Sequence, residues 1–287
     1  MSAEEARAVS ARAAAGDPDA LAISAMLAAL GAWEPQDWHA AARRLAQAAR
    51  AGHVGAQGQL AVLSSGRDGA PDSLAAAIDW SAWLAPAARR RILNEPRMAV
   101  AEGFLSQAAC AWMIARAHGR TVQAMVFDAE GSGGGRIEKA RSNTAFEFAL
   151  EDLDVVSIAI RARMAATIGV PAGALEPMQV LHYAPGETFE RHYDFLDPAV
   201  PGYAADVERR GQRIATFLTY LNAGFAGGET DFPLLGVRHK GGAGDGFIFA
   251  NVDAAGAPDR RTLHAGLPPA SGEKWVLSQW IRDRAMS

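Results

Sequence analysis

Six short segments after residue 175 constrain the fold more than any other feature of the chain. Each is bounded by turn residues and rich in β-branched and aromatic residues: MQVLHY, FERHYDF, RIATFLTYL, GDGFIFAN, RTLHAG and KWVLSQWIR. Several of them alternate apolar with polar residues, which is typical of strands with one buried face. The segments follow one another too closely for helical crossovers, which argues against a parallel α/β sheet. We therefore expect a β-sandwich or a β-barrel.

The first 60 residues have the opposite composition. They contain 21 alanines and 5 glycines, whereas residues 184–272 contain 14 of the chain's 29 glycines. Alanine favours helices, while glycine together with β-branched residues favours turns and strands. The turn-rich stretch SSGRDGAPDS begins a boundary region over residues 64–95. We expect an all-α region over residues 1–91 and a second domain over residues 92–287.

The helical region contains a weak internal repeat. AGDPDAL begins at residue 15 and AGHVGAQ begins at residue 51, 36 residues later, and in both a glycine separates two helices. This pattern resembles the short tetratricopeptide-like solenoid repeats of bacteria, in which helical hairpins stack. The resemblance implies a surface for a protein partner. The alternative is an alanine-rich helical cap on the neighbouring domain.

Composition and charge exclude several classes of protein. The 287 residues carry a formal net charge of −4, so phosphate-driven binding of nucleic acid is not expected. The apolar runs are shorter than the roughly 18 residues that a membrane-spanning helix needs. The only cysteine, Cys110, permits neither an intrachain disulfide nor a thiolate metal cluster. The N-terminus lacks the basic and apolar stretches of a signal peptide, so we expect a cytoplasmic protein.

His192 and Asp194 form the most informative short motif. Residues i and i+2 of a strand point to the same face, so this imidazole and this carboxylate could bind one ion. A second imidazole is available at His264, in another predicted strand. Two histidines and one carboxylate form the facial triad of non-haem iron(II) oxygenases. The alternative for the motif is an exposed strand with a salt bridge.

Lys274 follows His264 by ten residues, across the turn AGLPPASGE. An ammonium group inside a barrel mouth is costly unless it meets an anion. A 2-oxo dicarboxylate would supply that anion, because one end can chelate iron while the far carboxylate pairs with Lys274. The alternative is a surface lysine at the start of a strand.

The motifs that contain these residues occur in one order over residues 96–283. They are Tyr183-X-Pro185-Gly186, His192-X-Asp194, Arg213 and Thr216 before Tyr220-Leu221-Asn222, Gly227-Gly228-Glu229-Thr230, Gly244-Asp245-Gly246, His264-Ala265-Gly266 and Gly272-X-Lys274-Trp275. In this order and spacing the segment resembles the prolyl 4-hydroxylase branch of the iron- and 2-oxoglutarate-dependent dioxygenases. The resemblance does not extend to the N-terminal helical region.

The resemblance implies an α+β fold, with a double-stranded β-helix (a jelly roll) and helices packed outside it. It implies iron ligands at His192, Asp194 and His264. Lys274 would bind the distal carboxylate of 2-oxoglutarate, and Tyr183 would contact the same molecule. The implied cofactor and cosubstrates are Fe(II), 2-oxoglutarate and dioxygen, and ascorbate is a candidate reductant.

Thr219 is a further candidate for binding 2-oxoglutarate. On the predicted strand it shares a face with Ala215, Phe217 and Leu221, so it is a lone hydroxyl among apolar groups. The family often has a hydrogen-bonding residue at this position. The alternative is a hydroxyl bonded to the local backbone.

Three residues are candidates for contacting the substrate. Arg141 and Arg213 are expected near the mouth of the barrel, and Trp280 lies six residues after Lys274, on the same strand face. Solvated or structurally paired arginines are the alternative for the first two. A plain core tryptophan is the alternative for Trp280.

The resemblance implies hydroxylation of an unactivated C–H bond, in a prolyl residue of a protein or peptide, with release of succinate and carbon dioxide. Three alternatives stay open. The substrate could be a free amino acid or another small molecule, or the barrel could be a degenerate protein-interaction module. A cupin-like metal hydrolase or isomerase is the third, and it would need neither Lys274 nor 2-oxoglutarate.

Overall fold

The structure is a computed structural model, and the residues that it describes are 1–124, 126–127, 135–136 and 141–285. The chain divides into two compact units. The N-terminal unit consists of Met1–Pro86 and Ala149–Met164. The β unit consists of Ala87–Phe148 and Ala165–Ser287.

The N-terminal unit begins with a series of short helices. They are α1 (Ala3–Ala14), α2 (Pro18–Leu30), α3 (Trp38–Arg50), α4 (Val54–Leu63), α5 (Pro71–Ala76) and α6 (Trp80–Leu84). Asp17 and Asp37 begin α2 and α3, since each carboxylate accepts a hydrogen bond from the backbone N–H three residues later. Buried alanines line the contact between α2 and α3, and their small side chains allow close approach of the two helices.

Two glycines separate helices at equivalent points of this unit. Gly16 and Gly52 have φ angles of 85° and 93°, in the left-handed region that glycine adopts without strain. The next residues, Asp17 and His53, are the N-caps of α2 and α4. The 36-residue spacing seen in the sequence thus recurs in the helix boundaries. The likeness to tetratricopeptide-like repeats stays a prediction.

Helix α8 (Val155–Ile168) follows the turn η1 (Leu150–Asp152), and most of it belongs to the N-terminal unit. The side chain of Gln59, from α4, accepts a hydrogen bond of 2.9 Å from the backbone N–H of Val155. Asp154 caps the first turn by accepting from the backbone N–H of Ser157 at 2.7 Å. The unit is therefore assembled from two separate stretches of the chain.

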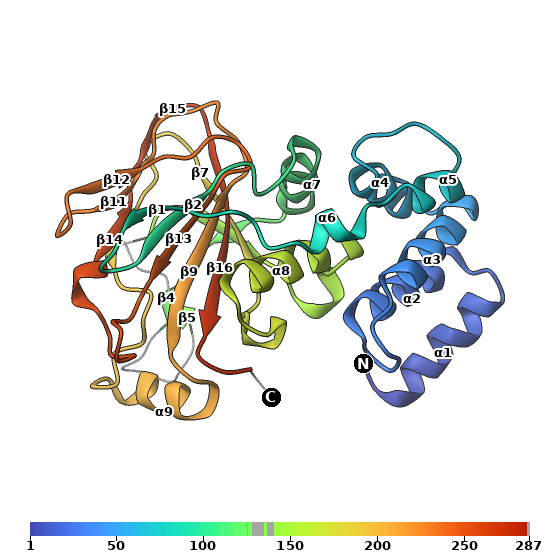
Figure 1. Cartoon of the computed structure of the whole chain (residues 1–287), viewed down its shortest axis with the longest axis horizontal. Coiled ribbons are helices and arrows are strands. Elements are labelled where there is room, and N and C mark those ends of the chain that lie inside the picture. Colours follow the sequence, from blue (N-terminus) through green and yellow to red (C-terminus); the bar gives the residue numbers. More distant parts are fainter. Residues whose placement is uncertain (125, 128–134, 137–140, 286–287) are drawn as a thin grey trace. The chain divides into compact units, whose positions relative to one another are not determined.

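The β unit contains two main antiparallel sheets (Figure 1). The major sheet has the strand order β1 (Arg90–Leu93), β2 (Met98–Ala101), β13 (Gly246–Ala250), β9 (Arg213–Tyr220), β16 (Lys274–Arg282), β7 (Gln179–Tyr183), β6 (Thr144–Glu147) and β3 (Val122–Gln123). The minor sheet has the order β12 (Val237–His239), β11 (Thr230–Phe232), β14 (His264–Gly266) and β8 (Phe189–His192). Two short pairs complete the described strands: β10 (Ala226–Gly227) with β15 (Pro269–Ser271), and β4 (Val126–Phe127) with β5 (Gly135–Arg136).

Aromatic side chains from both sheets form the core between them. Phe232 of the minor sheet packs against Phe247 and Phe249 of the major sheet, with ring centroids 6.0 and 5.0 Å apart. All three are fully buried in a cluster that also includes Met98 and Val276. The two facing antiparallel sheets confirm the predicted double-stranded β-helix in an α+β protein.

The remaining helical elements of the β unit are α7 (Gln107–Ala117), α9 (Pro201–Arg210) and the short turns η2 (Ala172–Ala174) and η3 (Arg260–Thr262). The hydroxyl of Ser106 caps α7 by accepting from the backbone N–H of Ala109, as expected for serine at an N-cap. Within the described parts of the chain, every helix is too short or too polar to cross a membrane.

Candidate metal centre

His192 and His264 lie directly opposite each other on neighbouring strands. His192 ends β8 and His264 begins β14, and the antiparallel register pairs the two residues. Side chains at paired positions lie on the same face of a sheet, so the two rings come together with centroids 4.2 Å apart. Strand pairing thus joins two residues that are 72 positions apart in the sequence.

Asp194 completes the group from the segment just after β8. The predicted strand was expected to include this residue, but the ladder ends at His192 and Asp194 lies in a bend. Its carboxylate still reaches both imidazoles: Oδ1 lies 3.7 Å from Nε2 of His192, and Oδ2 lies 3.6 Å from Nε2 of His264. One ligand atom from each of the three residues falls within 4.8 Å of the others.

Backbone carbonyls fix the orientation of both rings. Nδ1 of His192 lies 2.7 Å from the carbonyl oxygen of Glu190, and Nδ1 of His264 lies 3.0 Å from that of Thr262. A carbonyl only accepts, so each Nδ1 carries the hydrogen and each Nε2 presents its lone pair to the centre of the group. Such outer hydrogen bonds set the tautomer of metal-binding histidines.

The protonation states favour a divalent cation. Burial and the neighbouring His264 lower the pKa of His192 to about 3, so this ring is neutral. Burial alone would raise the pKa of Asp194, but the two imidazoles and a hydrogen bond from Thr216 hold it below its ordinary value. Two imidazoles and one carboxylate are the donor set that suits iron(II) with open coordination positions. The residues present therefore fit the predicted metal.

A cavity adjoins these three residues and includes Lys274. Its wall includes alternate residues of β16, which are Lys274, Val276, Ser278 and Trp280, together with residues of β7, β8, β9, β11 and β14. Lys274 is 2% exposed, and burial lowers the pKa of its ammonium group to about 7. An anionic partner strongly stabilises a buried cation of this kind, because it offsets the cost of removing the charge from water.

Two tyrosines flank this lysine. Tyr183 pairs with Lys274 across β7 and β16, and the ammonium nitrogen lies 4.7 Å from the centre of the Tyr183 ring. Burial raises the pKa of Tyr183 to about 12, so its hydroxyl stays protonated and able to donate. Tyr220 lies slightly farther away, at 5.9 Å from the ammonium nitrogen. The structure thus brings Lys274 and Tyr183 together, as the resemblance implied.

Thr219 does not lie on the cavity wall. Leu218 of β9 lines the cavity, and Thr216 points to Asp194, so the even-numbered positions face the site and Thr219 faces away. The structure therefore does not bring Thr219 to the cavity that contains Lys274 and the three candidate ligands. Both faces of β9 are buried, which is why the alternation of residue types misidentified the inner face.

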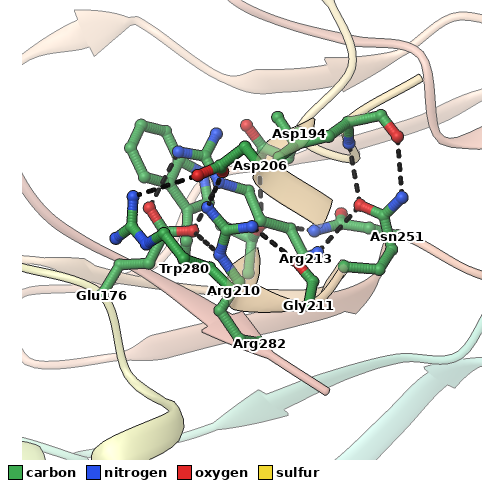
Figure 2. A network of polar contacts seen from close by, with 12 residues as sticks. Glu176, Asp194, Asp206, Arg210, Gly211, Arg213, Asn251, Trp280 and Arg282 are labelled. Carbon is green, nitrogen blue, oxygen red and sulfur yellow. Dashed lines mark hydrogen bonds and ion pairs between the residues drawn. The ribbon is translucent and has the colours of Figure 1, made fainter. Parts of the chain in front are cut away.

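Arg141 and Trp280 both line the cavity, whereas Arg213 does not. Arg213 instead donates two hydrogen bonds to the carboxylate of Glu176, at 2.7 and 2.8 Å, and stacks over the ring of Trp280 at 3.7 Å (Figure 2). This pairing is the structural alternative that the sequence left open for Arg213. Arg141 stacks over Phe189 at 4.4 Å, at the same cavity.

Sequence reasoning missed two hydroxyl groups at the site. Thr216 donates a hydrogen bond of 2.6 Å to Oδ2 of Asp194, and Ser278 lies on the cavity wall. Ser278 lies four residues after Lys274 on the same strand, so the two side chains point to the same face. Counting along the predicted strand from Lys274 could therefore have identified Ser278. Thr216 belongs to one of the quoted motifs, but its contact with Asp194 depends on tertiary structure.

Comparison with known proteins agrees with this geometry. A sequence profile of the 2OG-Fe(II) oxygenase superfamily matches residues 178–282, which include the three candidate ligands and Lys274. Prolyl 4-hydroxylase 1 of Arabidopsis thaliana is 32% identical over 205 residues, covering 67% of this chain and 71% of the plant protein. Probable prolyl 4-hydroxylase 7 of the same plant is 32% identical over 208 residues, covering 66% of this chain and 64% of that protein.

Among solved structures, the viral collagen prolyl hydroxylase of Paramecium Bursaria Chlorella virus-1, in complex with 2OG, is 28% identical, with a TM-score of 0.48. The match covers 64% of this chain and 95% of the viral one. The identity and coverage shared with the plant enzymes assign the family. The chain belongs to the prolyl 4-hydroxylase branch of the 2OG-Fe(II) oxygenase superfamily and is a 2-oxoglutarate-dependent dioxygenase.

Proposed function

We propose that this enzyme hydroxylates prolyl residues in a protein or peptide. In this proposal His192, Asp194 and His264 bind Fe(II), and Lys274 binds the distal carboxylate of 2-oxoglutarate. The observation that carries the proposal is the buried ammonium group of Lys274 in the same cavity as the three ligands. A hydrolase or isomerase on a similar barrel would have no use for this cation.

Bound Fe(II), with 2-oxoglutarate and dioxygen, supplies the oxidation of a C–H bond together with the release of succinate and carbon dioxide. The protein holds the reactants in place. Lys274 fixes one end of 2-oxoglutarate, and the hydroxyl of Tyr183 is available to donate to the same carboxylate. The carbonyls of Glu190 and Thr262 keep both imidazoles in the ligating tautomer.

The substrate side of the cavity consists of larger groups. Arg141, Phe189 and Trp280 contribute to its wall, and they would orient the substrate relative to the metal. A prolyl substrate is supported by the names of the two plant relatives described above, a prolyl 4-hydroxylase and a probable prolyl 4-hydroxylase. An apolar pyrrolidine ring suits aromatic walls such as those of Phe189 and Trp280.

The test supplies the full-length protein with Fe(II), 2-oxoglutarate and air. Proline-containing peptides are one arm and free proline is the other, with His192→Ala as the inactive control. We expect succinate release and a gain of one oxygen on a peptide. Modification of free proline alone would favour the small-molecule alternative. Activity without 2-oxoglutarate would reject the dioxygenase assignment of the site.

We also propose that the N-terminal unit contacts a protein partner or substrate. The unit contains an open groove, with Trp38, Trp80 and Leu84 among its lining residues, and this combination of aromatic and aliphatic groups supports the proposal. Substituting Trp38 by serine should weaken turnover of a protein substrate and leave turnover of a short peptide unchanged. Equal effects on both substrates would contradict it.

A cytoplasmic location is the last part of the proposal. It is supported by Cys110, the only cysteine, which is buried in α7 as a free thiol whose pKa burial raises to about 12. Such a thiol is inert and leaves the enzyme independent of oxidative folding. Recovery of the protein with membrane or secreted fractions of fractionated cells would contradict this location.

A further inference from the structure

The two oxygens of the Asp194 carboxylate have different surroundings. Oδ2 accepts a hydrogen bond of 2.6 Å from the hydroxyl of Thr216, and the side-chain amide of Asn251 donates to that same hydroxyl at 3.0 Å. Figure 2 shows Asn251 and Asp194 in the same network of polar contacts. Thr216 and Asn251 are both fully enclosed, at 1% and 0% exposure. No described side chain donates to Oδ1 in the same way.

The chemistry of these groups gives the chain of hydrogen bonds one direction. An ionised carboxylate only accepts, so the single hydrogen of the Thr216 hydroxyl points to Asp194. The hydroxyl oxygen then needs a donor, which is the amide nitrogen of Asn251. The backbone of Asn251 is fixed on both sides, since its N–H donates to Ile214 and its carbonyl accepts from Asp259.

We propose that Thr216 is a positioning residue that restricts Asp194 to binding the metal through Oδ1 alone, and that Asn251 orients Thr216 for this task. The inference rests on the proposed metal site. An octahedral ion with three single-atom protein ligands keeps three positions open. A carboxylate that used both oxygens would take one of them, and 2-oxoglutarate with dioxygen needs all three.

The proposal predicts separate effects on the metal and on 2-oxoglutarate. In Thr216→Val the hydroxyl is replaced by a methyl group of nearly the same size, and Oδ2 becomes free to bind the metal. We expect the affinity for Co(II) to change by less than about threefold. The affinity of the metal-loaded protein for 2-oxoglutarate should fall by at least about tenfold, because the second oxygen competes for a position.

The experiment uses the full-length protein without oxygen. Co(II) binding is followed by its visible absorption, whose intensity reports the coordination number, and 2-oxoglutarate is titrated into the Fe(II) form by its charge-transfer absorption. Thr216→Ser keeps the hydroxyl and should restore the 2-oxoglutarate titration of the wild type. An unchanged titration in Thr216→Val would overturn the proposal, and so would equal losses in the Val and Ser variants.

Two controls keep the outcomes distinct. Failure of the wild type to bind Co(II) would contradict the metal site itself, whereas binding with no effect of Thr216→Val contradicts only this inference. If Thr216→Val does not fold, Asn251→Ala decides the question. Without the amide donor the hydroxyl can rotate away from Oδ2, so the affinity for 2-oxoglutarate should fall by about threefold or more. An unchanged titration would overturn the proposal.

Discussion

Lys274 and Tyr183 face each other across strands β16 and β7, and the ammonium nitrogen lies 4.7 Å from the centre of the tyrosine ring. The ring covers the ammonium group and removes it from water, but it cannot neutralise the charge. In the described part of the structure, Glu229 is the carboxylate that raises the pKa of Lys274, and burial outweighs it. The pair is thus a candidate recognition site for an anion, beside the candidate metal centre.

The first prediction concerns the candidate ligands. His192→Ala, Asp194→Ala and His264→Ala should each abolish succinate formation and weaken metal binding by more than about 100-fold, because two groups would remain to bind the ion. His192 and His264 lie at the ends of their strands and Asp194 lies just beyond one, so the fold should persist in each variant. Calorimetric titration with Co(II) and a thermal melt measure the two effects. Full activity of any one variant removes that residue from the site.

The second prediction concerns Lys274. Lys274→Met should raise the dissociation constant of 2-oxoglutarate by about 30-fold or more while metal binding persists. Truncating one partner of a buried charge pair costs about 2–5 kcal/mol, which corresponds to such a change. The matched control is Lys240→Met, which removes an exposed lysine that contacts Phe225. Equal 2-oxoglutarate titrations for the two variants would move the anion site elsewhere.

The stability of the same variant separates binding from folding. The pKa of Lys274 is about 7 in the folded protein and has an ordinary value of 10.5, so the charged group destabilises the fold below about pH 7. This cost disappears as the pH rises from about 7 to about 10.5. Lys274→Met should therefore be at least as stable as the wild type at pH 6.5 without ligands. Chemical denaturation at that pH measures the difference.

The third prediction concerns the pH dependence of 2-oxoglutarate binding. The dicarboxylate needs a charged Lys274, but above about pH 7 most unliganded molecules carry the neutral amine. Binding at pH 8.5 should therefore take up a proton, and the affinity should fall by up to about tenfold per pH unit. Calorimetry in two buffers with different ionisation enthalpies detects the proton. Identical heats in both buffers would show that Lys274 is already charged.

The fourth prediction concerns the pair of Glu176 and Arg213. Glu176 also binds Arg282, as Figure 2 shows, and both Glu176 and Arg282 are buried. Glu176→Gln removes the carboxylate that pairs with both Arg213 and Arg282 and leaves Arg282 with Asp206 as its carboxylate partner, so the free energy of unfolding should fall by about 3–5 kcal/mol. Denaturant unfolding of the metal-free protein measures it.

A surface pair provides the control for that change. Asp197→Asn breaks the ion pair with Arg260, whose side chain is 67% exposed, and should cost at most about 1 kcal/mol. Folded Glu176→Gln should still bind metal with the affinity of the wild type, because Glu176 does not touch the ligands. If Arg213 bound substrate directly, the variant would instead lose activity with little loss of stability.

The grouping of the three candidate ligands could be predicted from the sequence because each residue belongs to a short motif. His192 and His264 lie on separate strands, and the spacing of two residues to Asp194 brings its carboxylate back to the site even though β8 ends at His192. The prediction needed only the correct residue types near a strand end. It did not depend on the exact residue at which the strand pairing of β8 ends.

The sequence could not predict which face of β9 points to the site. Thr216 and Tyr220 face the site while Phe217 and Thr219 face away, and all four are buried. When both faces of a strand are covered, the alternation of polar and apolar residues no longer distinguishes them. A hydroxyl was expected at the site, but its position could be assigned only once the partner of Thr216 was known.

The pairing of Glu176 with Arg213 could not be predicted from sequence periodicity, for another reason. The two residues are 37 positions apart, and a local pattern does not specify which carboxylate meets which guanidinium group. The sequence therefore leaves open whether Arg213 contacts substrate or forms a structural pair. Only the packing of β9 against the segment before β7 identifies it as a structural residue.

The last prediction concerns the N-terminal unit. A fragment that begins at residue 87 lacks α1 to α6 but retains residues 149–164, which cluster with those helices. Val156, Ile158 and Ile160 of α8 are buried in the full chain. We expect the fragment to aggregate, because removing most of this unit exposes apolar surface on α8. Size-exclusion chromatography of the fragment against the full-length protein measures this.

The control removes only residues 1–16. Helix α1 contributes no buried residue, so this shorter deletion should leave the protein monomeric and able to bind Co(II) and 2-oxoglutarate as the full chain does. A monomeric fragment 87–287 with unchanged thermal stability would contradict the prediction and would make the N-terminal unit a separable module. A fragment that is soluble but binds no metal would contradict more, because the metal site would then depend on helices that contribute none of its ligands.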